Sequence, residues 1–219
     1  MSLEIRYLKT KYKPSSNLVL FSDDKFNITK LKKHLTTNEF LYVNDLLKAS
    51  DLKKNLLVFE LNSKKKLVLV SIKKKSKSSE IESLGAEFYS RINYGKSTEY
   101  FIISDSLEDK NQNFLSHFLH GLKLKSYSFK KYKTKKKDER NIFINVIGKQ
   151  NIPSLQTRSK FKALEEGTFY ARDLVSEPGN ILHPDEYAKR ISSLRKEGLK
   201  INIYDEKKLK KLGMHALLG

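Results

Sequence analysis

The sequence predicts an α/β fold in which helices cover both faces of a mixed sheet, over about residues 1–150. Short apolar, β-branched segments alternate with longer segments whose apolar residues recur every three or four positions, as in strands and amphipathic helices. Two of the short segments, 55–61 and 67–72, are apolar at nearly every position, which is typical of strands buried on both faces. We therefore expect a three-layer α/β/α domain, then a helical linker over 151–183 and the start of a second α/β domain over 184–219.

Six segments are expected to be strands. They share short length and a high content of apolar and β-branched residues, and they lie at 3–9, 17–21, 55–61, 67–72, 100–103 and 142–147. The first two are expected to lie across a turn built by Pro14, Ser15 and Ser16. The third and fourth, separated by a short polar loop, are expected to form a hairpin.

Three amphipathic helical regions are expected between these strands. Their apolar residues are, in chain order, Leu31, Leu35, Phe40, Val43 and Leu47; then Ile81, Leu84, Phe88 and Ile92; then Phe114, Phe118 and Leu122. Ser78 or Ser79 is expected to cap the second region and Gly95 to end it. Gly85 and Gly148 are isolated positions that form no Gly-rich loop for phosphate.

A long helix is expected to run from residue 155 to an elbow. The residues expected on its apolar side are Leu164, Thr168, Ala171 and Val175. Pro178 and Gly179 should end the helix, because Pro lacks a backbone donor and Gly tolerates the left-handed turn.

Beyond the elbow, Pro184 fits the first position of a helix over 184–196, where its missing N–H costs nothing. A strand over 200–204 and a short helix over 206–211 are expected to follow. One strand and three helices cannot enclose a core of their own. We therefore expect the residues after Pro178 to be loosely held.

The chain carries an unusually high positive charge. Its formal net charge is +19, from 44 Lys and Arg against 25 Asp and Glu. Residues 1–150 hold 31 of the basic and 16 of the acidic residues, and Lys runs at 64–66, 73–77 and 130–137 supply most of the excess. Lys is less suited than Arg to forked phosphate recognition. A solvated Lys-rich surface is the simpler interpretation, and a nucleic-acid patch is the alternative.

Other totals limit the class of protein. No run approaches the ~18 apolar residues that a membrane span needs, and residues 1–11 do not resemble a signal peptide. The absence of Cys excludes disulfides and thiolate zinc sites. These observations predict a soluble, cytoplasmic protein without a membrane partner.

Three segments carry a family resemblance in a fixed order. Residues 171–184 read Ala-Arg-Asp-Leu-Val-Ser-Glu-Pro-Gly-Asn-Ile-Leu-His-Pro, and residues 121–137 and 203–219 supply the flanking motifs. With these motifs the chain resembles the leucyl (cytosol) aminopeptidase family. The resemblance implies that residues 1–150 form a macro-like amino-terminal domain, and that residues 184–219 are a truncated start of the metallopeptidase catalytic domain. Because no Gly-rich phosphate loop is present, ADP-ribose binding is not carried over.

The resemblance also implies an activity for a full-length parent. Members of the family remove the amino-terminal residue from peptides with two divalent ions, Zn or Mn, bound by motifs reading roughly Thr-Phe-Asp-Ser-Gly-Gly and Asn-Thr-Asp-Ala-Glu-Gly-Arg. Neither motif occurs here, so no residue is assigned a catalytic or metal-binding role, and the segment is expected to bind no metal and to be inactive alone. Its expected role is architectural, in a homo-oligomer similar to the hexamer of the family.

A local metal site is one alternative. His117 and His120 are three positions apart on one predicted helix face, a spacing that metal sites use, but no Cys or nearby carboxylate completes a set. A half-exposed pair of helix residues is the simpler interpretation. Glu165 and Glu166 are adjacent and do not converge on one point, which favours helix-surface roles.

A basic nucleic-acid-binding module is a second alternative, with DNA as partner. Its candidate contacts are Lys130, Lys131, Lys133, Lys135, Lys136 and Lys137. Aromatic residues among such lysines can stack on bases. Tyr127 and Phe129 belong to the segment that resembles the family, however, so packing at the domain edge is the favoured interpretation of them. A third interpretation is a degenerate subunit that assembles with an intact paralogue.

Two histidines depart from the pattern of the family. His183 stands where Thr is usual, just before Pro184, and is a poorer N-cap. A pH-sensitive elbow and a tolerated substitution are the two interpretations of this change. His215 stands where Gly is common, so that a Cβ lies where the backbone is expected to turn tightly.

Overall fold

The computed structural model describes residues 2–9, 12–73, 75–94, 98–107, 113–134 and 140–218. The chain divides into two compact units, Met1–Phe169 and Tyr170–Gly219, called here the first and second units.

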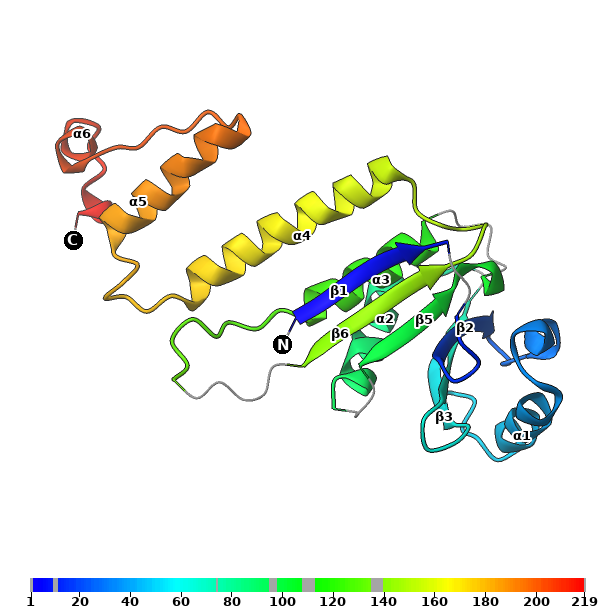
Figure 1. The fold of residues 1–219 in the computed structure, drawn as a ribbon. Coiled ribbons are helices and arrows are strands. Elements are labelled where there is room, and N and C mark those ends of the chain that lie inside the picture. Colours follow the sequence, from blue (N-terminus) through cyan, green and yellow to red (C-terminus); the bar gives the residue numbers. More distant parts are fainter. Residues whose placement is uncertain are drawn as a thin grey trace. The chain divides into compact units, whose positions relative to one another are not determined.

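Within the described residues, the first unit contains one six-stranded sheet. Its strands are β1 (Ser2–Leu8), β2 (Asn17–Asp23), β3 (Leu56–Glu60), β4 (Lys66–Ile72), β5 (Glu99–Ile103) and β6 (Asn141–Ile147). They lie in the order β1-β6-β5-β2-β4-β3 (Figure 1). Neighbouring strands are parallel except β3 and β4, which are antiparallel. The sheet is therefore mixed and mostly parallel.

The expected hairpin is confirmed by β3 and β4, in which Leu57 lies opposite Leu69. The expectation that the first two strands lie across a turn from one another is wrong. β1 pairs with β6, whereas β2 lies between β4 and β5. A turn does form after Lys13, because the Ser16 N–H donates to the Lys13 carbonyl at 3.0 Å. The strand that follows it is buried on both faces, and such a strand takes a central place with a partner on each side.

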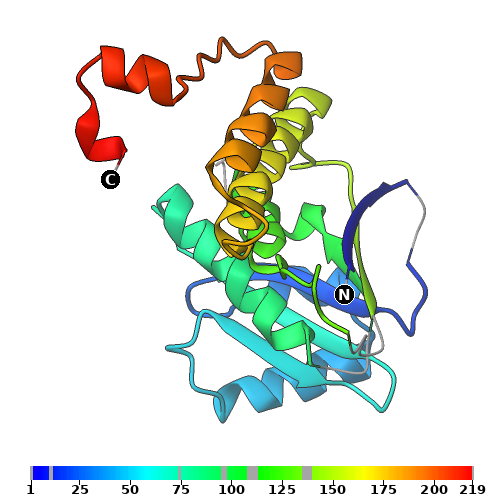
Figure 2. The same ribbon diagram turned by 90° about the vertical axis from the view of Figure 1, so that its left-hand side faces the viewer.

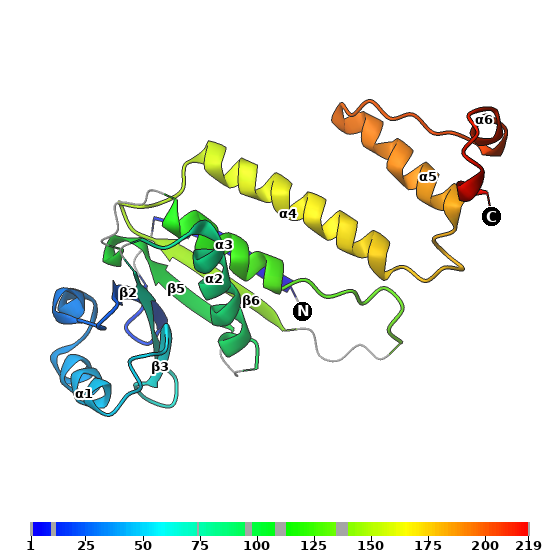
Figure 3. The same ribbon diagram turned by 180° about the vertical axis from the view of Figure 1, so that it is seen from behind.

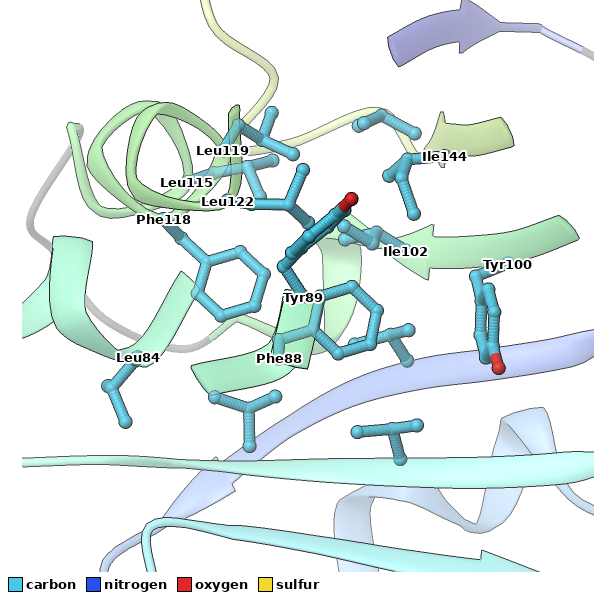
Figure 4. Close-up of a cluster of buried hydrophobic side chains, with 14 of the residues drawn as sticks. Leu84, Phe88, Tyr89, Tyr100, Ile102, Leu115, Phe118, Leu119, Leu122 and Ile144 are labelled. Atoms are coloured by element: carbon cyan, nitrogen blue, oxygen red, sulfur yellow. The ribbon is translucent and has the colours of Figure 1, made fainter. Parts of the chain in front are cut away.

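Two helices, α2 (Ser78–Ile92) and α3 (Phe114–Lys125), cover one face of the sheet (Figure 3). Their predicted apolar faces are confirmed, because Ile81, Phe88 and Phe118 are fully buried. The Phe118 ring centroid lies 5.7 Å from that of Phe88 and 5.6 Å from that of Phe21 on β2 (Figure 4 shows Phe88 and Phe118). This first core thus joins helix and strand residues through aromatic contacts.

The start of α2 differs from its prediction. Ser78 and Ser79 lie inside the helix, and Lys77 occupies the N-cap position. The Lys77 backbone N–H donates to the Glu80 carboxylate at 2.8 Å, so a side chain from the first turn supplies the cap that a serine was expected to supply. Gly95, the expected end of this helix, lies outside the described residues.

Two glycines let the backbones of α2 and α3 touch. A Cβ placed on Gly85 would lie 1.9 Å from the carbonyl oxygen of Phe118, and a Cβ placed on Gly121 would lie 1.9 Å from that of Glu82. Each helix presents its glycine to a carbonyl of the other. Gly85 is therefore a packing residue within a helix and not an isolated position between elements.

The other face of the sheet is covered by η1 (Thr29–His34) and α1 (Thr37–Lys48). A second core lies here, in which Val43 and Leu47 of α1 join Leu20 and Leu69 of the sheet. In Figure 2 the strands lie between α1, in light blue, and α2, in teal. The predicted helix–sheet–helix layering is thus observed. A short turn of helix, η2 (Ser104–Ser106), follows β5.

A buried ion pair ties α1 to the sheet. Glu39 and Thr36 cap the helix reciprocally, with the Thr36 N–H donating to the Glu39 carboxylate at 3.0 Å. The other carboxylate oxygen accepts from Lys65 Nζ at 2.7 Å, and the two side chains of this pair are only 18% and 5% exposed. Burial alone would raise the pKa of Glu39, but the hydrogen bonds from Lys65 and Thr36 outweigh it and hold the pKa below its usual value.

The helix α4 (Leu155–Ser176) confirms the predicted long helix but not its predicted buried face. Leu164 is 48% and Val175 is 87% exposed. The half-buried positions on the first part of α4 are Thr157, Arg158, Phe161, Glu165, Thr168 and Phe169, of which only Thr168 belongs to the predicted face. These positions also recur at helical spacing. The two aromatic rings give this face more apolar surface than one Leu and one Val provide, so it is the face that packs against α3 and β1 within the first unit.

The second unit consists of the end of α4, then α5 (Pro184–Ser193), η3 (Leu194–Glu197), α6 (Glu206–Lys211) and η4 (His215–Leu217). Pro184 occupies the first position of α5, as predicted. Asp205 caps α6 by accepting the Lys208 N–H at 2.8 Å. The Arg190 guanidinium donates to Glu177 at 3.0 Å and to Glu186 at 2.9 Å, which joins α5 to the end of α4.

The strand expected over 200–204 is not observed. In the described residues of the second unit, no other segment is extended to pair with it, and a strand without a partner leaves its backbone groups to water. Residues 200–204 therefore form an irregular connection between η3 and α6, with Tyr204 50% exposed.

Candidate functional site

A cavity of about 480 Å³ lies within the first unit, between β1, α3 and the first part of α4. Small-molecule sites in proteins commonly have volumes in this range. Strand β1 contributes Leu3, Ile5 and Tyr7 to its wall, and α4 contributes Phe161 and Phe169. These apolar residues share the wall with polar and charged residues, which are Glu4 from β1, Ser116, His120 and Lys123 from α3, and Arg158, Lys162, Glu165 and Glu166 from α4.

Two histidine–carboxylate pairs flank Phe161. His117 Nδ1 lies 2.8 Å from Glu82 on α2, and His120 Nδ1 lies 3.2 Å from Glu165 on α4. The Phe161 ring centroid is 5.1 Å from the His117 ring and 5.0 Å from the His120 ring. Each of the two histidines thus has a carboxylate beside it, contributed by another helix. Each imidazole has its own carboxylate, so the two do not converge on one point as a metal site would require.

Glu165 is a buried partner of His120 and not a surface residue as expected. Its side chain is 14% exposed. Burial raises the pKa of Glu165, and the hydrogen bond from His120 and the positive charge of Lys123 oppose this rise without cancelling it. Glu166 does lie at the surface, 3.7 Å from Lys162.

Three further polar groups line the cavity. The Arg158 guanidinium carbon lies 3.5 Å from the centre of the Tyr7 ring, while its Nε donates to the Pro153 carbonyl at 2.8 Å. Lys123 Nζ donates to the Leu3 carbonyl at 2.6 Å. Burial raises the pKa of the Tyr7 phenol, and the positive charge of Arg158 opposes this rise. The wall of the cavity thus holds the cations Lys123 and Arg158 and the largely buried carboxylate of Glu165, while Glu4 and the exposed Lys162–Glu166 pair also line it.

Ser116 is the remaining polar residue of the α3 wall. It is 4% exposed, and among the described residues its hydroxyl has no hydrogen-bond partner. A buried hydroxyl without a partner is unfavourable. This group is available to a small molecule or to water in the cavity.

Sequence analysis missed the cavity, because its polar groups come from three separate elements. The helical spacing of Phe161, Glu165 and Phe169 was the one signal available, since it marks a second face on the long helix. The pairing of His120 with Glu165 spans 45 positions of the chain, and no local pattern predicts such a contact.

The candidate nucleic-acid segment follows α3. Of its six lysines the structure describes Lys130, Lys131 and Lys133, and the other three, Lys135, Lys136 and Lys137, lie outside the described residues. Tyr127 packs against Phe169 with ring centroids 5.3 Å apart, as expected for packing at the domain edge. Phe129 and Tyr132 lie 5.8 Å apart, and Tyr132 is 48% exposed with Lys131 Nζ at 5.6 Å from its ring.

Neither of the two substituted histidines forms a site. His183 is the N-cap residue of α5, and its side chain makes no capping hydrogen bond. Near His215 the backbone does turn tightly, but the positive φ of 71° is at Gly213. His215 therefore needs no unusual backbone conformation.

In the part of the chain that the structure describes, no group of three or more His, Cys, Asp or Glu side chains could hold a metal ion. None of the described helices is both long enough and apolar enough to cross a membrane.

Residues 169–219 match a family model described as the cytosol aminopeptidase family, catalytic domain. A probable cytosol aminopeptidase from a Bradyrhizobium species is 44% identical over 102 residues, which are 45% of this chain and 20% of that protein. Another from Phytoplasma australiense is 36% identical over 126 residues, which are 57% of this chain and 26% of that protein. The match therefore spans only a fifth to a quarter of the length of these relatives.

Solved structures share the fold over most of this chain. A mutant tomato leucine aminopeptidase has a TM-score of 0.70 at 17% identity and covers 97% of this chain, which matches 46% of that one. The bottromycin maturation enzyme BotP in complex with Mn has a TM-score of 0.62 at 14% identity, with 91% of this chain and 40% of that one covered. At these identities the likeness shows the fold alone, and it supports the α/β prediction.

Proposed function

We propose, from its similarity to the cytosol aminopeptidase family, that this chain forms part of a leucyl-type metallo-aminopeptidase, which removes amino-terminal residues from peptides. The match of residues 169–219 to the catalytic domain of that family carries this proposal. The first unit would be the macro-like amino-terminal domain, and the second unit would be the start of the catalytic domain.

The proposal separates the activity of the protein from the role of these residues. Two divalent ions, Zn or Mn, would polarise the scissile carbonyl and activate a water molecule. The described residues offer no group that fits such ions, and the sequence contains neither family motif that binds them. We therefore assign the segment an architectural role, in a hexamer-like assembly that acts in the cytoplasm on peptides.

A peptidase assay tests this division. The 219-residue chain and a longer form that carries both metal-binding motifs are assayed on leucine p-nitroanilide with added Mn²⁺ or Zn²⁺. We expect hydrolysis only from the longer form, with loss of activity when a chelator is added. Metal-dependent hydrolysis by the 219-residue chain would show that the segment is itself catalytic. Light scattering on the longer form tests the hexamer.

A basic nucleic-acid-binding module is the second candidate. The exposed ring of Tyr132 with Lys131 beside it supports this candidate, because bases stack on exposed aromatic rings near cations. It predicts a complex with single-stranded or duplex DNA that weakens steeply between about 50 and about 200 mM salt. Gel shifts that show no complex at either salt concentration would remove it.

A further inference from the structure

We propose that the cavity between β1, α3 and α4 binds a free apolar α-amino acid in its zwitterionic form. The inference deepens the proposed function, on which its biological meaning rests, because such amino acids are the products that an aminopeptidase releases. The binding itself depends only on the groups that line the cavity.

The apolar walls fit an aliphatic or aromatic side chain. Leu3 and Ile5 from β1, Leu119 from α3, and Phe161 and Phe169 from α4 line the cavity. A volume of about 480 Å³ is enough for an amino acid of the size of leucine or phenylalanine together with water. Burying the side chain against these residues would supply the non-directional part of the affinity.

Glu165 provides the negative pole. Its carboxylate is largely buried, and the burial keeps its pKa raised even though His120 and Lys123 lie close to it. A carboxylate in this state gains from a further positive group. The ammonium group of an amino acid in the cavity would supply that charge together with hydrogen-bond donors.

Arg158 and Lys123 provide the positive pole. Arg158 donates from its Nε to the Pro153 carbonyl, and among the described residues its two terminal nitrogens have no hydrogen-bond partner. Lys123 Nζ gives one of its donors to the Leu3 carbonyl. These remaining donors suit a carboxylate, which guanidinium and ammonium groups bind through charge-assisted hydrogen bonds.

The two poles belong to one cavity. The charge of Arg158 and the charge of Glu165 both act on the Tyr7 phenol, which lies in the same wall. The hydroxyl of Ser116 is buried in this wall without a partner among the described residues. A ligand with both charges would therefore add a partner for the Ser116 hydroxyl and further charged partners for Glu165 and Arg158.

Calorimetric and NMR titration of the 219-residue chain tests the proposal. The probes are L-leucine, 4-methylpentanoate, which lacks the ammonium group, leucinamide, which lacks the carboxylate, and glycine, which lacks the side chain. We expect leucine to bind at least about tenfold more tightly than each of the other three. The amide signals that shift should belong to β1, α3 and the first part of α4.

Variants locate the site. Glu165→Gln and Arg158→Gln should each weaken leucine binding about tenfold or more. Glu60→Gln, on β3 at the opposite edge of the sheet from β1, and Lys160→Gln, at an exposed position of α4, should leave it unchanged. Ile5→Phe should block binding by filling the cavity, while the melting temperature shows that the variant is folded.

Three results would overturn the proposal. They are no saturable leucine binding, equal binding of 4-methylpentanoate, and unchanged affinity in folded Glu165→Gln protein. These results do not test the proposed function, because none of the measurements requires peptidase activity. Leucine binding with no peptidase activity in the longer form would reject the proposed function and keep the site.

Discussion

The two units of the molecule differ in what holds them together. The first unit has two cores, one on each face of the sheet, with strand residues that are fully buried. In the second unit the described residues include one buried apolar residue, Leu174, while Val175 is 87% and Leu217 is 65% exposed. Helix formation therefore does not by itself indicate a core. The second unit has its helices because local signals specify them.

Those local signals can be named. Pro184 fixes the start of α5, Asp205 caps α6, and Arg190 bonds to two carboxylates. A helix cap such as that of Asp205 typically contributes about 1 kcal/mol. The first unit gains more from burial, since each fully buried large apolar side chain contributes roughly 2–3 kcal/mol. Measurements of local stability should therefore find the first unit more stable than the second.

Hydrogen exchange should show the largest contrast. We expect the amides of α5 and α6 to exchange about 10³-fold faster, relative to their intrinsic rates, than those of β4, because local opening of the second unit exposes little apolar surface. Exchange followed by mass spectrometry on the 219-residue chain measures this ratio. Equal protection of α5 and β4 would mean that the second unit is held by contacts other than those described.

Truncation of a core ring should be the next largest effect. Phe118→Ala removes a ring that packs on Phe21 and Phe88, and it should lower the free energy of unfolding by about 3–5 kcal/mol. Leu217→Ala in the second unit should change it by less than about 0.5 kcal/mol, since that side chain is exposed. Urea denaturation of both variants compares the two units directly. Similar losses in the free energy of unfolding for the two variants would show that the second unit is also held by a core.

The glycine contact between α2 and α3 should come third. Gly121→Ala forces a Cβ against the backbone of α2, and it should cost about 3 kcal/mol because a backbone carbonyl cannot move aside cheaply. Gly167→Ala, in α4, meets nothing within 4 Å and should stabilise the protein by about 0.5–1 kcal/mol. Thermal and urea unfolding measure both. A stabilised Gly121→Ala variant would contradict the close approach.

The Glu39–Lys65 pair should give the smallest effect, visible as a pH dependence. The pKa of Glu39 is lower in the folded chain than its usual value of 4.5, so its contribution to stability is present above about pH 4.5 and is lost as the pH falls through the folded pKa. Lys65→Met should flatten this part of the stability profile and cost about 2 kcal/mol at neutral pH, because it leaves a buried carboxylate without its partner. An unchanged profile would argue against the pair.

The parts of the fold that sequence analysis predicted correctly are those that depend on neighbouring residues. The hairpin of β3 and β4, the apolar face of α2 and the start of α5 at Pro184 all follow from local patterns. The strand order did not follow, because β1 pairs with a strand 139 positions away in the chain. The prediction of a strand over 200–204 was wrong for a related reason, because a strand forms only where another strand pairs with it.

The candidate site was less predictable than the fold. His117 and His120 were recognised from their spacing, but their carboxylates come from α2 and α4. The sequence predicts that the face of α4 with Leu164 is buried, but Leu164 is 48% exposed. The helical spacing of apolar residues does not say which of two possible faces packs against the rest of the protein. No pattern in the sequence links Tyr7 to Arg158, and the two side chains meet only when α4 packs beside β1.

The position of β1 at one edge of the sheet has a consequence for biosynthesis. The ribosome makes Ser2–Leu8 139 residues before their partner Asn141–Ile147. At 5–20 residues per second this delay is on the order of 10 s. During that time Leu3, Ile5 and Tyr7 have no sheet to join, so the nascent chain must keep an apolar segment from aggregating until β6 emerges.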